Sequence, residues 1–130
     1  MVTEFILTFV VFPKDLNPSV GTLFGGKLLA EMDTCAGTLC KRLLRKSECN
    51  AFVTAKIKSV LFNKPAFLGD IITVHGKLSA LDETGADVYI LVTKEIANGP
   101  DKGQTVKIAS GVFQMVSIKD GKRHPHGVKT

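Results

Sequence analysis

Among the residues that could carry chemistry, Asp33 has the most unusual surroundings. It falls in a stretch whose apolar residues recur at about 100° per residue, the period of an amphipathic helix. The apolar arc comprises Leu28, Leu29, Met32, Cys35, Ala36, Leu39, Cys40 and Leu43. Asp33 does not project with the charged residues, and its neighbours one and two turns away are small: Gly26, Ala30 and Gly37. Space beside a carboxylate favours a ligand channel, and the open alternatives are a basic partner or a capped backbone N–H.

A glycine-rich segment opens the predicted helix. Gly21 to Leu28 matches the phosphate-binding pattern G-x-x-x-x-G-K, but Leu28 replaces the Ser or Thr that would bind magnesium, which argues against a nucleotide hydrolase. Gly25 and Gly26 instead present unpaired backbone N–H groups at the positive end of the helix dipole, where an oxyanion would bind. Asp33 follows roughly 10 to 12 Å further along the helix, so a thioester held along this groove would reach both.

Other polar residues are weaker candidates. Asn17 lies in a proline-punctuated loop, where an Asx turn is the simplest explanation. His75 occupies an alternating strand position typical of a surface or satisfied core histidine, and we expect His124 and His126 to be solvated in the tail. None of these spacings is typical of metal ligands, so we predict no metal site.

The cysteines indicate packing and not catalysis. Cys35, Cys40 and Cys49 are an odd number without a Cys-x-x-Cys pair, so neither a disulfide framework nor a zinc ribbon is indicated. Cys35 and Cys40 fall on the apolar arc of the helix, where thiols are usually inert. A thiolate pair with a histidine is the alternative.

Composition and charge narrow the class of protein. A chain of 130 residues with 45% hydrophobic content fits one domain, residues 1–130. It has no apolar run of the roughly 18 residues that a membrane span needs, and no signal-peptide pattern, so we expect a cytoplasmic protein without membrane insertion. The net charge of +5 is scattered, with one Tyr and no Trp to stack on bases, which argues against nucleic acid and fits a compact anion such as a coenzyme phosphate.

The order of elements predicts an α+β fold. Residues 4–12 read as a strand, residues 25–45 as the helix, and residues 52–62, 70–81, 87–96 and 106–118 as four more strands joined by hairpin-length loops. This order predicts an antiparallel five-stranded sheet wrapped on one helix. The strand at 87–96 is apolar on both faces, so we expect a homodimer or a larger assembly.

Motifs of one family are present across most of the chain. The sequence resembles the hotdog-fold acyl-CoA thioesterases, in particular the group of bacterial broad-range and brain-type acyl-CoA hydrolases. The matching motifs are Asn17-Pro18, Gly21-x-x-Phe24-Gly25-Gly26-x-Leu28-Leu29-x-x-Met32-Asp33-x-x-x-Gly37, Val53-Thr54-Ala55, Phe62-x-x-Pro65-x-x-x-Gly69-Asp70 and Ala109-Ser110-Gly111-Val112-Phe113.

This resemblance implies roles for particular residues. The curved antiparallel sheet would wrap the helix, protomers would pair sheet edge to sheet edge, and dimers would assemble further, often as hexamers. Active sites would lie between protomers. Asp33 would act as general base or nucleophile, Asn17 of the other protomer would position the water or thioester, and the Gly25 or Gly26 N–H would polarise the thioester carbonyl.

The resemblance also implies how acyl-CoA is bound. Phe24 and Thr54 belong to the matching motifs, and Met32 and Phe62 would line the acyl channel. Relatives carry a Gly-x-x-Ser segment that contacts the coenzyme, but here Gly85 is followed by Ala86 and Asp87 and the serine is absent. From their charge alone, and not from the resemblance, we expect Lys58, Lys64, Lys122 and Arg123 to meet the coenzyme phosphates instead.

We therefore predict an acyl-CoA hydrolase that needs neither metal nor cofactor, with CoA present only as part of substrate and product. The alternative is a non-catalytic acyl-CoA binder or sensor on the same fold. A hotdog dehydratase is disfavoured because no histidine precedes a suitable acid on the helix.

Overall fold

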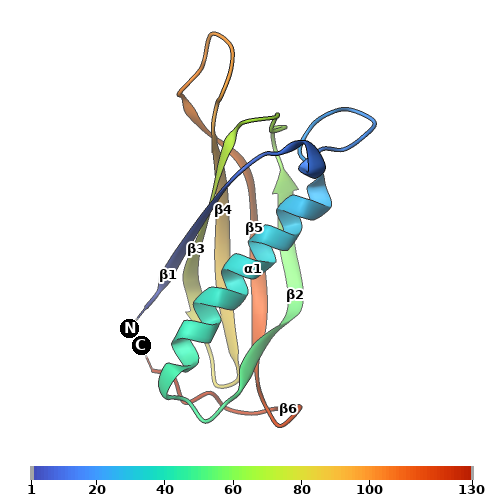
Figure 1. Ribbon diagram of the computed structural model, residues 1–130. Coiled ribbons are helices and arrows are strands. Elements are labelled where there is room, and N and C mark those ends of the chain that lie inside the picture. The colour runs from blue at the N-terminus through green and yellow to red at the C-terminus, as the bar shows by residue number, and fades with distance from the viewer. Residues whose placement is uncertain (1, 130) are drawn as a thin grey trace.

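The computed structural model describes residues 2–129 as one long helix lying across a curved sheet (Figure 1). The helix, α1, spans Gly25–Leu43, and the strands are β1 (Glu4–Val10), β2 (Ala51–Phe62), β3 (Ile71–Leu81), β4 (Gly85–Glu95), β5 (Thr105–Lys119) and β6 (Lys122–Arg123). The sheet order is β1-β3-β4-β5-β2, with β6 pairing to β5, and every pair is antiparallel. The predicted α+β hotdog architecture is confirmed.

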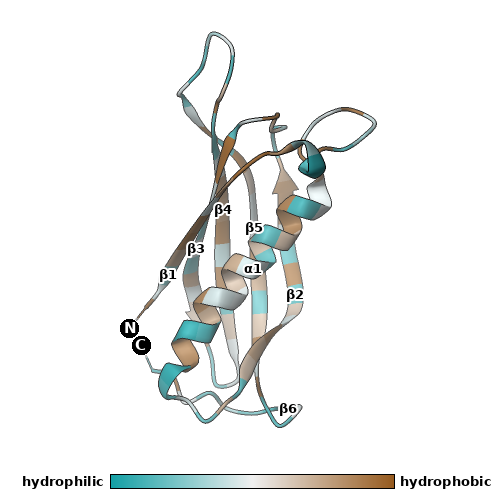
Figure 2. Cartoon of the chain, in the orientation of Figure 1, coloured by the Kyte–Doolittle hydropathy of each residue, from teal (hydrophilic) through white to brown (hydrophobic). Residues whose placement is uncertain are grey.

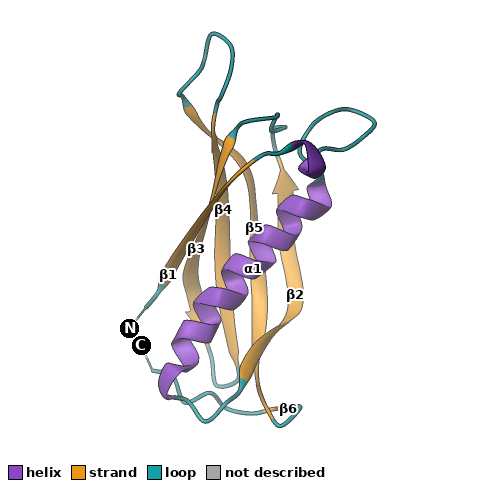
Figure 3. Cartoon of the chain, viewed as in Figure 1, coloured by secondary structure: helices purple, strands orange, loops and turns teal. Residues whose placement is uncertain are grey.

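The element boundaries differ from the predicted ones mainly at the ends. The helix was expected to reach residue 45, but Leu44–Lys46 form a tighter 3-10 turn after it, as commonly happens at helix ends. A second 3-10 turn, Pro13–Asp15, follows β1. The two-residue strand β6 is a sixth strand that the sequence did not predict, and it lies where the chain turns back after β5 (Figure 3).

The core lies between the apolar arc of α1 and the facing side of the sheet. On the helix the buried residues are Leu28, Met32, Cys35, Ala36, Leu39, Cys40 and Leu43, which confirms the predicted arc apart from the half-buried Leu29. On β4, Val88, Ile90 and Val92 are fully buried and alternate with half-buried residues. The hydropathy colouring of Figure 2 shows apolar bands on the helix among hydrophilic ones. Burial of this arc fixes the rotation of α1, and hence the direction in which Asp33 points.

Strand β2 forms one edge of the sheet, beside α1. It carries two irregularities in its pairing with β5, and Ser59, within the second of them, adopts a positive φ of 53°. Four large apolar side chains on this strand are exposed: Val53, Ile57, Leu61 and Phe62. Unpaired backbone groups and exposed apolar side chains at one edge are typical of a surface that pairs with another chain.

The tail is packed and not solvated as predicted. His126 is only 3% exposed, and its ring lies 5.6 Å from that of Phe52. Its Nε2 donates to the Gly85 carbonyl at 3.2 Å, and its Nδ1 accepts from the Val128 N–H at 2.9 Å. His124 is half-buried and contacts Glu48 at 2.6 Å. Tertiary contacts between segments far apart in the chain, which local composition does not report, hold the tail in place.

Within residues 2–129, no helix has the length and apolarity needed to cross a membrane.

Candidate active site

The start of α1 offers free backbone donors. Its N-cap residue, Phe24, provides no side-chain acceptor, and the Phe24 carbonyl receives the N–H groups of Lys27 and Leu28. Among the described residues, no hydrogen bond uses the N–H of Gly25 or Gly26. The first turn also contains no acidic residue. Two unpaired donors at the positive end of the helix are therefore available to a negatively charged oxygen.

The two glycines differ in what surrounds them. A Cβ at Gly25 would meet nothing within 4 Å, whereas one at Gly26 would lie 2.5 Å from Cε2 of Phe24. The Phe24 ring thus lies against Gly26 and is itself 51% exposed. Gly25 is the more open of the two donors.

A cavity of about 350 Å³ lies beside this helix start. It brings together four residues that the sequence predicted for the site: Asn17, Gly25, Phe62 and Lys64. The remaining lining residues are Thr22, Leu23, Leu28, Asn63, Pro65, Ala66 and Ile108. Its size falls within the range of small-molecule sites, roughly 300 to 1,000 Å³.

Asn17 forms the expected Asx turn and keeps donors free. Its Oδ1 accepts the Ser19 N–H at 2.9 Å, and its backbone N–H donates to the Thr22 carbonyl at 2.7 Å. In the described part of the chain, no hydrogen bond uses the Asn17 side-chain amide N–H groups. The turn therefore fixes the carboxamide and leaves its N–H groups unpaired at a residue that lines the cavity.

Asp33 is half-buried and faces the edge strand. Thr54 Oγ1, on β2, donates a hydrogen bond of 2.5 Å to Asp33 Oδ1. None of the ion pairs formed by residues 2–129 includes Asp33, and no backbone N–H donates to it. A Cβ at Gly37, one turn away, would meet nothing within 4 Å, and Ala30 is exposed. Asp33 thus has neither a basic partner nor a backbone N–H that it caps, which are the two ordinary structural roles of such an acid. The space beside it is open.

Several predicted substrate-binding residues lie elsewhere in this protomer. Met32 is fully buried and packs under β5, 3.4 Å from the position of a Cβ on Gly111, so it belongs to the core and does not line the cavity at the start of α1. Lys58 lies 3.9 Å from Asp87, which is therefore partly neutralised. Lys122 and Arg123 form β6, at the end of the sheet opposite the start of α1 (Figure 1).

Gly85 is held by the turn between β3 and β4. Its carbonyl accepts from Asp82 N–H at 3.0 Å and from His126, and a Cβ on it would lie 2.8 Å from an Asp82 carboxylate oxygen. The local turn accounts for this glycine, and its coenzyme contact stays a prediction.

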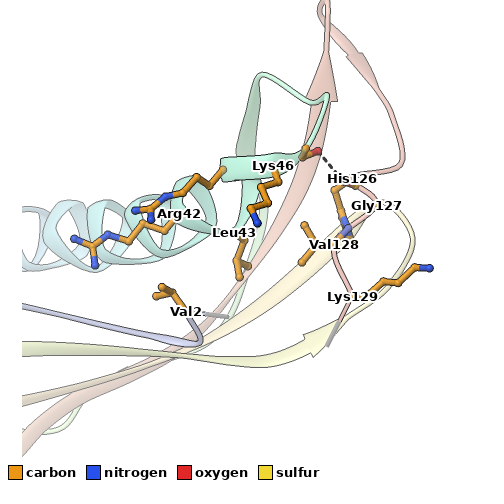
Figure 4. Close-up of a pocket in the computed structure, with 10 residues that line it drawn as sticks. Val2, Arg42, Leu43, Lys46, His126, Gly127, Val128 and Lys129 are labelled. Atoms are coloured by element: carbon orange, nitrogen blue, oxygen red, sulfur yellow. Dashed lines mark hydrogen bonds between the residues drawn. The ribbon is translucent and has the colours of Figure 1, made fainter.

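A larger cavity, about 610 Å³, lies at the other end of α1 (Figure 4). It is lined by Val2, Arg42, Leu43, Arg45, Lys46, Ser47, His126, Gly127, Val128 and Lys129, and so contains none of the predicted site residues. The amine of Lys129 points away from it. The smaller cavity is the candidate site, because it contains Gly25, whose N–H is free, and three more of the predicted site residues.

Burial makes the helix cysteines poor nucleophiles. It raises the pKa of Cys35 from 9.0 to about 11, against a smaller lowering by a hydrogen bond from the Gly76 backbone. It raises the pKa of Cys40 to about 12. Both thiols are fully buried, and all three cysteines are free. This supports packing as the role of these residues over a thiolate pair.

Sequence reasoning did not single out a buried ion pair next to the cavity. Lys94 and Asp70 are 7% and 2% exposed, and Lys94 Nζ lies 3.6 Å from Asp70 Oδ2. The available signal was the alternation of β4, which places Lys94 on the same face as Val92 and Ile90. A lysine on the buried face of a strand indicates a partner, although the sequence does not identify it.

Comparison with known proteins supports this assignment of the fold. The thioesterase superfamily profile matches residues 20–98. The acyl-CoA thioester hydrolase YciA of Salmonella typhimurium is 28% identical over 124 residues, which are 94% of this chain and 89% of that protein.

Solved structures agree with the sequence comparison. A hexameric hotdog-fold thioesterase of Campylobacter jejuni is 30% identical, with a TM-score of 0.81 over 93% of this chain and 88% of its own. An acyl-CoA hydrolase mutant of Staphylococcus aureus in complex with coenzyme A is 25% identical, with a TM-score of 0.82 over 98% of this chain and 73% of its own. The chain belongs to the thioesterase superfamily.

Proposed function

We propose that this protein hydrolyses the thioester of acyl-CoA to a free fatty acid and CoA. Relatives named acyl-CoA thioester hydrolase, such as the Salmonella protein, support the substrate class. The observation that carries the proposal is Asp33: a half-buried carboxylate held by one threonine hydroxyl, with no ion pair to any residue in 2–129 and with open space beside it at Gly37. Such a group is free to act on water or on a carbonyl carbon.

Helix geometry supports catalytic groups that come from two copies of the chain. Asp33 and Gly25 are eight residues apart on α1, or about 12 Å at 1.5 Å per residue, whereas reacting atoms must approach to about 3 to 3.5 Å. A single thioester held along one helix would have to span this distance to reach both groups. Asp33 lies beside Thr54 on the open edge strand β2, where a second protomer would bring its own helix start.

In this mechanism each residue has one task. The Gly25 N–H, with Gly26, receives the thioester oxygen as negative charge develops on it. Asp33 of the other protomer either removes a proton from the attacking water, or attacks the carbonyl carbon itself to form a mixed anhydride that water then hydrolyses, and Thr54 orients its carboxylate. Asn17 donates from its free amide to the water or to the thioester. The leaving thiolate of CoA takes up a proton, and the acid product departs.

The assembly and cellular location are part of the same proposal. The Campylobacter relative is hexameric, and the exposed apolar edge of β2 supports a homodimer that assembles further to a hexamer. We propose a cytoplasmic protein, with reduced cysteines as support. We propose a reaction without metal or cofactor, and predict that a chelator leaves the rate unchanged.

Substitution of Asp33 tests the assignment. Asp33→Asn keeps the size and the Thr54 contact but removes the base, so thiol release should fall about 10²- to 10⁴-fold while circular dichroism and assembly stay unchanged. Thiol release is followed with butyryl-CoA and longer acyl-CoAs. Saturable binding of acyl-CoA by the unmodified protein without any thiol release would support the non-catalytic binder instead.

A mixing experiment tests the shared site. Asp33→Asn and Asn17→Ala chains are each expected to be nearly inactive, but in a mixed dimer one of the two sites has both residues intact. Random reassociation after mild denaturation should restore about a quarter of the wild-type sites. Mixtures no more active than their components would contradict a site built from two protomers.

A further inference from the structure

The ammonium group of Lys94 lies beneath the segment that connects β2 to β3. Lys94 ends the buried face of β4, after Val88, Ile90 and Val92, which are all fully buried. Its Nζ donates to the Pro65 carbonyl at 2.6 Å and lies 5.0 Å from the centre of the Phe67 ring. The lysine therefore contacts this segment through backbone and ring together.

Asp70 completes the arrangement from the other end of the same segment. Its Oδ2 accepts the Phe67 N–H at 2.8 Å, and its Oδ1 accepts the Ala97 N–H at 2.9 Å. With Lys94 at 3.6 Å, both carboxylate oxygens are used. The pair thus satisfies three backbone groups, in the segments between β2 and β3 and between β4 and β5, that lie outside the strands.

The segment held by this pair is a wall of the cavity at the start of α1. Pro65 and Ala66 line the cavity, and the Ala66 carbonyl accepts the Leu23 N–H at 2.8 Å. Leu23 also lines the cavity and lies two residues before Gly25. A continuous chain of contacts runs from Lys94 through Pro65 and Ala66 to the residues that present the free N–H groups.

The hydrogen bonds of this pair are suited to positioning the loop backbone. Replacing a buried ion pair by apolar residues is often neutral for stability, so charges are not needed here to hold β3 and β4 together. Three directed hydrogen bonds to loop backbone are what apolar side chains could not supply. We propose that Lys94 and Asp70 are positioning residues that fix the cavity wall relative to the Gly25 N–H, an inference that rests on the proposed hydrolase function.

If the cavity wall loses the hydrogen bonds of this pair, the thioester carbonyl shifts away from the Gly25 N–H. A displacement of about 1 Å costs up to about 100-fold in rate, whereas binding of the coenzyme portion depends on other contacts. Lys94→Met and Asp70→Asn are therefore expected to lower kcat about 10- to 100-fold and to change the KM for acyl-CoA and the Kd for free CoA by less than about threefold. Lys94→Arg keeps the charge and donors and should recover most of kcat.

A matched control separates positioning from loss of stability. Ile90→Ala truncates a fully buried residue on the same face of the same strand, about 13 Å from Lys94, and destabilises by about 2 to 5 kcal/mol. It should keep kcat within about twofold at a temperature where the protein is folded. If Lys94→Met does not fold, Asp70→Asn and Lys94→Arg carry the comparison.

Hydrogen exchange supplies a readout that does not depend on activity. The Leu23 amide should lose protection about 10-fold or more in Lys94→Met and keep it in Ile90→Ala. Equal kcat losses in the two variants, or unchanged Leu23 protection in Lys94→Met, would overturn the inference. Absence of thiol release from the wild-type protein would refute the hydrolase proposal instead, while Leu23 exchange would still decide whether the pair positions the wall.

Discussion

The ionisation of the two helix cysteines at alkaline pH should show whether they serve in packing or in catalysis. Cys35 and Cys40 are fully buried on the core face of α1, and burial raises their pKa values from 9.0 to about 11 and about 12. At pH 8 the thiolate fraction of each is therefore about 100-fold and about 1,000-fold below that of the unfolded chain. Alkylation by iodoacetamide should be slowed at least by these factors.

The same pKa values predict how stability depends on pH. Because the pKa of each thiol is raised in the folded state, its contribution to the free energy of unfolding is fully present below the unfolded value of 9.0. This contribution is lost as pH rises toward 11 and 12. Across this pH window each buried thiol lowers the free energy of unfolding by about 1.4 kcal/mol per pH unit. From pH 8 to pH 10 the two together should lower the free energy of unfolding by about 3 kcal/mol.

A double variant isolates this effect from lysine and tyrosine titration. Urea unfolding of the wild type and of Cys35→Ala with Cys40→Ala is compared at both pH values and at one protomer concentration, because assembly makes stability concentration-dependent. The extra loss of about 3 kcal/mol should appear only in the wild type. Alkylation of Cys40 in the native protein as fast as in urea, with loss of thiol-release activity, would refute the reasoning and favour a cysteine nucleophile.

Two further predictions concern the substrate site. Gly25→Ala should stabilise the protein by about 0.4 to 1 kcal/mol in urea unfolding, because its Cβ meets open space, whereas Gly26→Ala must displace the Phe24 ring and should gain less; a larger gain at Gly26 would contradict this geometry. Asp87→Asn releases Lys58 from its ion pair and should lower the KM for acyl-CoA about two- to fivefold at low salt but not at high salt; an unchanged KM at low salt would show that Lys58 does not meet the coenzyme.

Local periodicity was sufficient to predict most of the fold. The apolar arc of α1 and the alternation of β4 depend on neighbouring residues in the chain, and both were confirmed. Strand β6 and the burial of His126 were not predicted. His126 is held by Gly85, some 41 residues away, so its environment is set by a tertiary contact that composition of the tail does not carry.

The same distinction between local sequence and tertiary packing applies to the candidate site. Asn17, Gly25 and Phe62 were predicted from local motifs and Lys64 from its charge, and the structure brings them to one cavity because β2 ends beside the start of α1. Lys94 was missed because the sequence shows a lysine on a buried face without showing the carboxylate that compensates it. Partner identity is a property of the packed fold, and it becomes visible only when β3, β4 and the connecting segment are placed together.

Asp33 shows how a correct local prediction still needs a global constraint. Helix periodicity alone directs its side chain away from the charged face, and the structure places it against Thr54 on the edge strand. The rise of the helix then forbids Asp33 and Gly25 of one chain from meeting at one carbonyl, because about 12 Å separates them. In the proposed mechanism the helix start of a second copy meets Asp33 at this sheet edge, so assembly through the edge of β2 and the chemistry of Asp33 are expected to be lost together when the edge is blocked. A proline at Ile57, which is exposed on that edge, should therefore abolish assembly and thiol release while leaving the Thr54 contact in place.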